Sequence, residues 1–299
     1  MTDRTETAAL VALLLVGPGA WSRHSEAVRS AGSAAAALAA SQGLFATESL
    51  ERARQEIAGW QQRRISVLSV FDPEYPGNLR RTSDPPPLLF AAGQWTIADE
   101  RAVAVVGTRQ PTPGGIRTAQ AITALLVEDR YTVVSGLAAG IDTAVHHAAL
   151  GSGGRTVAVV GTGLDHCYPR QNAALQRHIA RCGAVVSRFW PESPPTRRSF
   201  PLRNAVSAGL SLATVVVEAS PTSGTRIQAR LALEQKRLVV LMAPLLSQPW
   251  AQELAARPGV VVATEAVEVL TAVQDHAVAQ VSNDATPQPG AEPERELAV

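Results

Sequence analysis

Four glycine-containing turns follow apolar runs in this sequence, and each brings polar side chains with it. They are GTR at 107–109, SGLAAG at 135–140, GTGLD at 161–165 and SGT at 223–225. Glycine lets the backbone approach a ligand closely, and a helix that starts at such a turn offers free N–H groups to an anion. Arg109 adds a guanidinium that can pair with a phosphate or stack on a base. The four turns together predict a site for a phosphate-bearing ligand.

A local excess of arginine points to the same kind of ligand. Between positions 170 and 203 the sequence has one acid, Glu192, and seven arginines: Arg170, Arg177, Arg181, Arg188, Arg197, Arg198 and Arg203. Clustered guanidinium groups attract phosphate, although the net charge of the whole chain is only +1. Asn204, next to Arg203, is the candidate for contacting a base edge or a sugar.

The sequence argues against several catalytic classes. It has no Gly-Lys-Ser/Thr of a P-loop, and GTGLDH at 161–166 places His166 where the dinucleotide fingerprint needs its third glycine. His146 and His147 lie on adjacent helix faces without a third ligand, which predicts structural roles rather than a metal site. Ser135 has no evident base. We therefore expect no catalytic residue, no metal and no cofactor.

Three acidic residues stand at the ends of apolar runs. Glu218 leaves three roles open: it could hold a ribose hydroxyl, act as a base or fix a neighbouring loop. Asp142 and Asp165 are similarly placed, and we expect both to orient loops.

The elements that position these residues alternate between two patterns. Short apolar runs rich in valine, such as AVAVV at 102–106, are typical of strands buried on both faces of a parallel sheet. Further strands are predicted at 65–68, 89–93, 131–134, 156–160, 184–187, 213–217 and 238–242, with a strand and helix at 260–273. Helical segments between them imply right-handed crossovers, and hence an α/β fold with an extended Rossmann-like, doubly wound, mainly parallel sheet. In such a sheet the turns after the strands meet at one edge, where ligands bind.

Three regions are predicted from composition. Residues 1–58 are alanine-rich with helical spacing and form a small N-terminal helical domain; its turn at 16–20 resembles a helix-hairpin-helix module, but a plain helix connector is the favoured interpretation. Residues 59–274 form the Rossmann-like domain. Residues 275–299, rich in Pro and Glu, predict a disordered tail.

The remaining sequence features concern where in the cell the protein is located. The two cysteines, Cys167 and Cys182, and the absence of a signal-like N-terminus indicate a cytoplasmic protein. The apolar run at 10–19 is too short to span a bilayer, so no membrane anchor is expected.

Six ordered segments resemble the DNA-processing protein DprA (Smf) family. They are GTRQPTPGG at 107–115, SGLAAGIDTAVHHAAL at 135–150, VVGTGLDHCYPRQNAAL at 159–175, SFPLRNAVSAGLS at 199–211, VVVEAS at 215–220 and SGTRIQARLALEQ at 223–235. The resemblance covers roughly residues 65–242. It implies a non-enzymatic domain that binds single-stranded DNA, usually as a homodimer, and passes the strand to the recombinase RecA in natural transformation.

The resemblance also implies roles in DNA binding for individual residues. Arg109 would contact phosphate, Ser135 and Gly136 would line the pocket, and Arg203 and Asn204 would meet the strand. The loop residues Gly161, Gly163 and Asp165 would shape the adjoining turn, and the DNA surface would also include Arg170, Asn172, Arg188, Ser223 and Gly224. The arginine-rich stretch would then be the electrostatic floor of the groove.

Two alternatives stay open, one from the glycine turns with Glu218 and one from departures from the family pattern. Ala205 stands where the family usually has a second arginine, Arg188 stands where it often has an acid, and no winged-helix pattern follows Val273. One alternative is a nucleotide-binding enzyme of the phosphoribohydrolase type, although Gln228 and Arg230 occupy positions where that loop needs an acid. The other is a regulatory or antitoxin-like relative that binds a partner protein.

Overall fold

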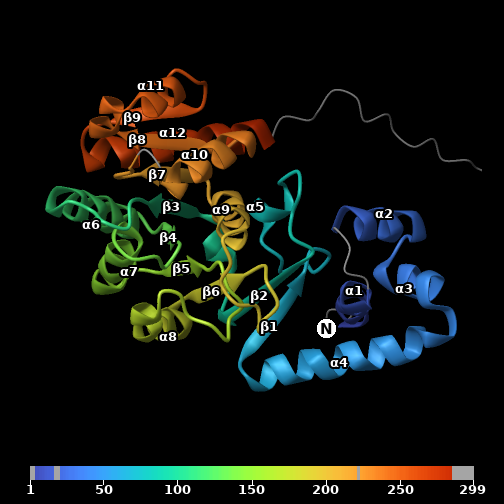
Figure 1. Ribbon diagram of the computed structural model, residues 1–299. Coiled ribbons are helices and arrows are strands. Elements are labelled where there is room, and N and C mark those ends of the chain that lie inside the picture. Colours follow the sequence, from blue (N-terminus) through green and yellow to red (C-terminus); the bar gives the residue numbers. More distant parts are fainter. Residues whose placement is uncertain (1–3, 17–20, 221–222, 285–299) are drawn as a thin grey trace, which may run out of the picture.

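The computed structural model describes residues 4–16, 21–220 and 223–284. Its centre is a nine-stranded sheet in the order β1-β2-β6-β5-β4-β3-β7-β8-β9 (Figure 1). The strands are β1 (Ile65–Ser69), β2 (Leu88–Gly93), β3 (Ala102–Val106), β4 (Thr132–Ser135), β5 (Thr156–Val159), β6 (Ala184–Ser187), β7 (Ala213–Val216), β8 (Leu238–Met242) and β9 (Val260–Ala263). All neighbours from β6 to β9 pair in parallel, whereas β1 with β2 and β2 with β6 pair antiparallel. The predicted mainly parallel sheet is confirmed.

Helices cover both faces of this sheet because its strands are apolar on both sides. Val103 and Val105 pack toward one layer, and Ala104 and Val106 pack toward the other. The first layer contains α6 (Pro113–Glu128), α7 (Ile141–Gly151), α8 (Ala173–Cys182) and α12 (Ala266–Asp284). The second contains α5 (Gly77–Arg80), α9 (Ser199–Leu210), α10 (Gly224–Glu234) and α11 (Pro249–Ala255). The sheet is therefore doubly wound, as predicted.

The order of the strands creates a switch point beside β3. From β3 the chain adds β4, β5 and β6 in one direction, and then α9 leads to β7 on the opposite side of β3. In open α/β sheets the loops separate at such a point, and a crevice opens outside the carboxyl ends of the strands. Here those ends are Val106 of β3 and Val216 of β7.

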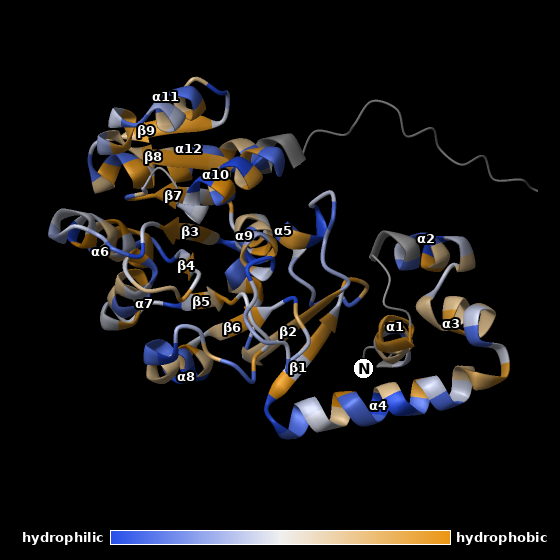
Figure 2. Cartoon of the chain, in the orientation of Figure 1, coloured by the Kyte–Doolittle hydropathy of each residue, from blue (hydrophilic) through white to orange (hydrophobic). Residues whose placement is uncertain are grey.

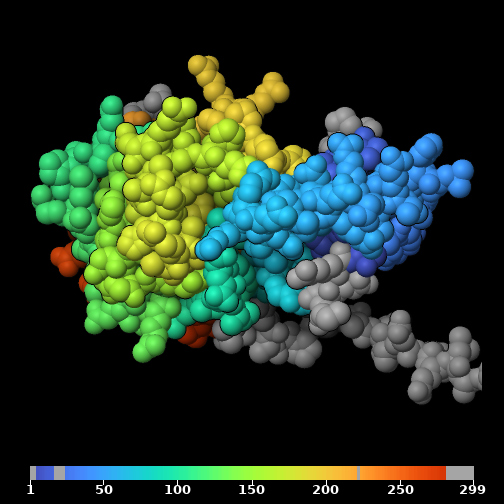
Figure 3. All heavy atoms as spheres, turned by 90° about the horizontal axis from the view of Figure 1, so that it is seen from below, coloured from blue at the N-terminus to red at the C-terminus, as the bar shows by residue number. Residues whose placement is uncertain are grey.

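Helices from the N-terminal region form a lobe beside the sheet (Figures 1 and 3). They are α1 (Arg4–Val16), α2 (Trp21–Ala31), α3 (Ala34–Gln42), the short η1 (Gly43–Phe45) and α4 (Ala46–Gln62). α1 is largely apolar, whereas α4 exposes a hydrophilic face (Figure 2). The predicted turn at 16–20 lies mostly outside the described residues.

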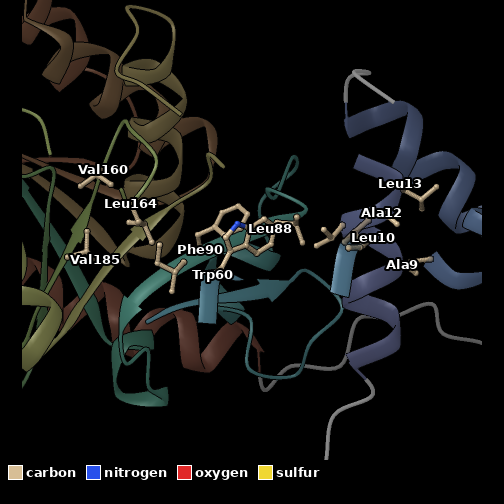
Figure 4. Close-up of a cluster of buried hydrophobic side chains, with 14 of the residues drawn as sticks. Ala9, Leu10, Ala12, Leu13, Trp60, Leu88, Phe90, Val160, Leu164 and Val185 are labelled. Carbon is tan, nitrogen blue, oxygen red and sulfur yellow. The ribbon is translucent and has the colours of Figure 1, made fainter. Parts of the chain in front are cut away.

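One core joins this lobe to the sheet. Trp60, near the end of α4, meets the ring of Phe90 edge-on, with centroids 5.1 Å apart, and lies 5.6 Å from the ring of Trp190 (Figure 4). The same cluster includes Leu10 and Leu13 of α1. The predicted boundary at residue 59 falls inside α4, because Trp60 extends the helix into this core.

The predicted boundary at residue 274 also falls inside a helix. α12 runs from Ala266 to Asp284, so residues 275–284 belong to it rather than to a disordered tail. Ala277 is partly buried and continues the helical apolar pattern of Val269 and Val273. Residues 285–299 lie outside the described part of the chain.

Within the described ranges, no helix is both long enough and apolar enough to span a membrane.

Candidate nucleic-acid interface

A cavity of about 510 Å³ opens at the carboxyl ends of β3 and β7, and we call it the switch-point cavity. Three of the four predicted turns contribute to it. Its walls consist of Val106, Gly107, Thr108, Arg109, Gln110, Ala138, Asp142, Phe200, Arg203, Asn204, Ser220, Ser223, Gly224, Thr225 and Gln228. The volume is within the range of roughly 300–1,000 Å³ that is usual for small-ligand sites. The structure therefore brings together Arg109, Arg203, Asn204, Ser223 and Gly224 of the predicted site.

Arg203 places a buried positive charge in this cavity. It lies on α9 and is only 6% exposed, with Nη1 3.9 Å from Oδ2 of Asp142. Its Nε has no hydrogen-bond partner among the residues that the structure describes. Burial lowers the pKa of Arg203, but an arginine guanidinium stays protonated in proteins. A buried, incompletely paired cation in a cavity wall favours an anionic ligand.

Asp142 orients this guanidinium and the turn after β4. Its Oδ2 accepts hydrogen bonds from the backbone N–H groups of Gly136 at 3.2 Å and Ala138 at 3.4 Å. Burial raises the pKa of Asp142, and the Arg203 charge and the backbone donor on Ala138 oppose that shift. The carboxylate is thus occupied by loop and guanidinium contacts, as the sequence predicts for a loop-orienting residue.

Ser135 and Gly136 support the cavity from behind instead of forming its surface. Ser135 is fully buried, and its hydroxyl donates to the carbonyl of Val105 at 2.7 Å. A Cβ on Gly136 would lie 1.5 Å from Nη1 of Arg203, so a glycine is needed for Arg203 to fit. The expectation that these two residues line the pocket is therefore corrected: Ser135 is buried at the end of β4, and the Arg203 guanidinium lies against Gly136.

An aromatic series extends from Arg109 across one rim of the cavity. The Arg109 Cζ lies 5.4 Å from the centre of the Phe200 ring, and that ring lies 5.6 Å from the ring of Tyr168. Gly161 also lies against Phe200, because a Cβ on this glycine would be 2.9 Å from a ring carbon. Tyr168 is 45% exposed. A cation beside accessible rings is suited to stacking on bases.

Phe200 was not predicted as a site residue. It precedes Arg203 by three positions on α9, so the two share a helix face. That spacing, once α9 is recognised as a helix, is the signal that could have identified it. Thr108 and Thr225 belong to the predicted turns but were not named as site residues, and Gln110, Ser220 and Gln228 were missed, because single polar residues carry no pattern of their own.

The start of α10 closes the opposite side of the cavity. Ser223 caps the helix by accepting a hydrogen bond from the Thr225 N–H at 3.2 Å, and Thr225 donates its hydroxyl to the carbonyl of Gly107 at 3.2 Å. Asn204 Nδ2 donates to the carbonyl of Gly224 at 3.2 Å, which ties α9 to α10. The positive end of the α10 dipole therefore faces the cavity together with the two arginines.

Three predicted residues hold neighbouring loops instead. Asp165 forms an ion pair with Arg63, next to the end of α4. Asn172 is buried and donates from Nδ2 to the turn after β4 at 2.9 Å. Gly163 lies against the backbone of Trp190, where a Cβ would come within 2.1 Å of the carbonyl oxygen. The described cavity walls contain none of the three, and a DNA contact by any of them stays a prediction.

The arginine-rich stretch does not form one continuous floor. Arg203 lines the cavity, but Arg177 and Arg181 lie exposed on α8, in the other helix layer. Arg188 is partly buried, and burial lowers its pKa while the charge of Asp84 opposes this. Arg170 is exposed in a short 3-10 helix, η3 (Arg170–Asn172), outside the cavity walls. The expectation fails because alternating strands and helices place nearby sequence positions on different faces.

Glu218, whose role the sequence left open, fixes a loop. Its carboxylate accepts from the Thr112 N–H at 3.0 Å and from the Thr112 hydroxyl at 3.2 Å. Thr112 is the N-cap of α6, where it accepts from the Gly115 N–H. The carboxylate is thus part of the structure that holds the loop after β3.

Glu218→Ala should accordingly lower the free energy of unfolding by about 1–2 kcal/mol, the usual effect of losing a partly exposed, charge-assisted hydrogen bond. Glu218→Gln keeps an acceptor oxygen and should lose less. Urea unfolding of the two variants measures this difference. Wild-type stability in Glu218→Ala would contradict the loop-fixing role.

No metal centre is evident in the described ranges: no three His, Cys, Asp or Glu side chains gather there in a way that could hold an ion. His146 is fully buried, with Nδ1 2.8 Å from the hydroxyl of Thr156. This contact gives His146 a structural role.

The fold and the cavity together define a class of protein. It is a doubly wound α/β domain whose switch point carries guanidinium groups, a helix N-terminus and neighbouring aromatic rings, all suited to a phosphate-bearing ligand. A family model then specifies the class further: DNA recombination-mediator protein A matches residues 66–274. The chain belongs to this family, and the DprA/Smf resemblance seen in the sequence is confirmed.

Individual relatives agree with this assignment. Protein Smf of Synechocystis is 44% identical over 181 residues, which are 59% of this chain and 46% of the relative. The match also covers 66% of the length of DNA processing protein DprA from Bacillus subtilis and 62% of the one from Streptococcus pneumoniae, so the chain spans about half to two thirds of these relatives. The crystal structure of DNA processing protein A from Streptococcus pneumoniae superposes with a TM-score of 0.65 at 33% identity, covering 79% of this chain and 85% of that one. DNA processing protein A from Helicobacter pylori, studied for its single-stranded DNA binding mode, shares the fold with a TM-score of 0.61 at 24% identity, covering 74% and 97%.

Proposed function

We propose that this chain binds single-stranded DNA in the switch-point cavity, without catalysis, and delivers the strand to a RecA-type recombinase. The observation that carries the proposal is a single cavity whose wall holds a buried guanidinium, Arg203, together with Arg109 and Phe200, with the partly exposed Tyr168 ring beside Phe200. We infer in addition that the protein acts as a homodimer in the cytoplasm, as the family resemblance implies.

Single-stranded DNA fits this chemistry better than a duplex. Its phosphates suit the guanidinium groups, and its unpaired bases can stack on aromatic rings without sequence selection. Duplex readers instead insert a helix or ribbon into a groove about 12 Å wide. The switch-point site is instead a hollow, a cavity of about 510 Å³.

The acidic and hydroxyl groups around the cavity favour binding over reaction. Glu218 holds Thr112, Asp142 holds the turn after β4, and the Ser135 hydroxyl is bonded to a strand carbonyl. Among these three residues, neither carboxylate is free to act as a general base on a hydroxyl nucleophile. We therefore favour a binding protein over the phosphoribohydrolase alternative, which incubation with a panel of nucleotides and detection of free base would revive.

Arg109→Ala should weaken binding of a single-stranded oligothymidine about tenfold, because it removes a phosphate partner and the cation beside the Phe200 ring. Arg109→Lys keeps the charge but loses the planar stacking group, so its affinity should lie between those of the wild type and of Arg109→Ala. Fluorescence anisotropy across a salt series measures the affinities, with Arg54→Ala on α4 as a charge-matched control.

The same titrations test the proposed function. Wild-type affinity should fall steeply with salt and should be far higher for the single strand than for the matching duplex. Equal affinity for both forms, or an Arg109→Ala variant that binds as tightly as the wild type, would contradict the proposal.

A further inference from the structure

We propose that the DNA strand continues from the switch-point cavity into a second cavity between α10 and α11. This inference rests on the proposed function and extends it to a longer binding path. The second cavity, which we call the α10–α11 cavity, has a volume of about 390 Å³. The wall residues that matter here are Ser223, Arg226, Arg230, Trp250, Glu253 and Arg257.

The chemistry of this cavity repeats that of the first. Arg226 lies with its Cζ 5.3 Å from the centre of the Trp250 ring, as Arg109 lies beside Phe200. Three arginines face a single wall carboxylate, Glu253. An indole ring can stack a base, and guanidinium groups can bind the flanking phosphates.

Trp250 is held in a defined position for this task. Its Nε1 donates to Oε1 of Gln248 at 2.7 Å, and Nε2 of Gln248 donates to the carbonyl of Ala219 at 2.6 Å. Ala219 directly precedes Ser220, which lines the switch-point cavity. The ring is therefore fixed relative to the loop after β7, which the two cavities share.

The two cavities meet one common wall residue at the start of α10. Ser223, the N-cap of that helix, lines both of them. Residues of α10 and α11 pack in one hydrophobic cluster with Val216 of β7 and Val239 and Leu241 of β8. Arg226 and Trp250 are the wall residues of the second cavity that we expect a strand passing Ser223 to contact.

The remaining charges allow a phosphate to enter. Arg230 pairs with Glu234 at 3.4 Å, but both side chains are more than half exposed, so this ion pair contributes little and can be exchanged for phosphate. Arg257 is exposed. The cavity wall therefore has three arginines and one carboxylate, Glu253, and its net charge is positive.

Oligonucleotide length separates this inference from the proposed function. We would measure the affinity of the full chain for oligothymidines of about four and about twelve nucleotides, at fixed salt. Arg226→Ala and Trp250→Ala should each weaken binding of the longer oligonucleotide about tenfold and leave the shorter one unaffected. Arg109→Ala should weaken both, and Arg54→Ala should weaken neither. Trp250→Phe, which keeps an aromatic ring, should retain most of the affinity for the longer strand.

Two outcomes overturn the inference in distinguishable ways. If both Arg226→Ala and Trp250→Ala bind the longer oligonucleotide as the wild type does, while Arg109→Ala is impaired, the strand does not enter the α10–α11 cavity but the proposed function stands. If Arg109→Ala is also unimpaired, the proposed function fails and the second cavity loses its basis. Thermal unfolding of each variant shows that a loss of affinity does not come from unfolding.

Discussion

Replacing Arg203 by alanine should lower the free energy of unfolding by about 3–5 kcal/mol and abolish binding of single-stranded DNA. The predicted loss of stability is this large because Asp142, which is 4% exposed, would be left as a buried carboxylate without its guanidinium partner. The loss of binding follows because Arg203 is the buried cation of the switch-point cavity.

Two further variants test the cause. Arg203→Ala combined with Asp142→Asn removes the uncompensated charge, so it should recover part of the stability without recovering DNA binding. Arg198→Ala removes an exposed arginine from the start of the same helix and should change stability by less than about 0.5 kcal/mol. Urea unfolding and anisotropy measure both properties. A double variant no more stable than Arg203→Ala would show that the buried pair is not the cause.

Acid should destabilise the protein through His146, by an amount on the order of 4 kcal/mol between pH 6.5 and pH 3. Burial lowers the pKa of His146 from 6.5 to about 3, and the neighbouring His147 and Arg203 charges add to the shift. In the unfolded chain this histidine takes up a proton below about pH 6.5, while the folded state takes none up until about pH 3. The unfolded state therefore binds more protons in this window, and stability falls as the pH falls.

His146→Asn retains a polar group that can reach Thr156 but cannot become charged in this range. The variant should be less stable than the wild type at pH 7, because the smaller side chain leaves space in the core, and its stability should fall less steeply on acidification. His178→Asn replaces an exposed histidine on α8 and should keep the wild-type profile. Chemical denaturation at a series of pH values gives the slopes, and an unchanged slope in His146→Asn would contradict this account.

The sequence was sufficient for the central sheet because its strands carry a strong signal. Runs such as Ala102–Val106 are uncharged, β-branched and bounded by turns, and the structure places them as fully buried parallel strands. The predicted borders of the sheet domain, at residues 59 and 274, fall inside helices. α4 continues through Trp60 and α12 continues through Ala277, past the predicted borders. Packing of these side chains stabilises the extra helical turns, and composition alone does not indicate it.

The candidate site was predictable where glycine turns follow strands, and less so where side chains from distant segments meet. Arg109, Arg203 and Ser223 come together because strand order fixes which loops share an edge. The family resemblance placed Ser135 and Asn172 at the DNA-binding surface. In the structure both side chains are buried and donate hydrogen bonds to backbone carbonyls. The Phe200–Tyr168 contact joins α9 to the loop after β5, a pairing that no local pattern indicates.

The central claim is that an unpaired strand lies over the switch-point cavity, against Phe200 and Tyr168. Photo-cross-linking tests it most directly: an oligothymidine carrying a 5-iodouracil is irradiated with the protein, and the adducts are located by mass spectrometry. The account predicts adducts on Phe200 or Tyr168, lost when an excess of unlabelled single strand competes and retained when duplex is added. Adducts confined to the N-terminal helices or to α8, with none at the cavity, would contradict it.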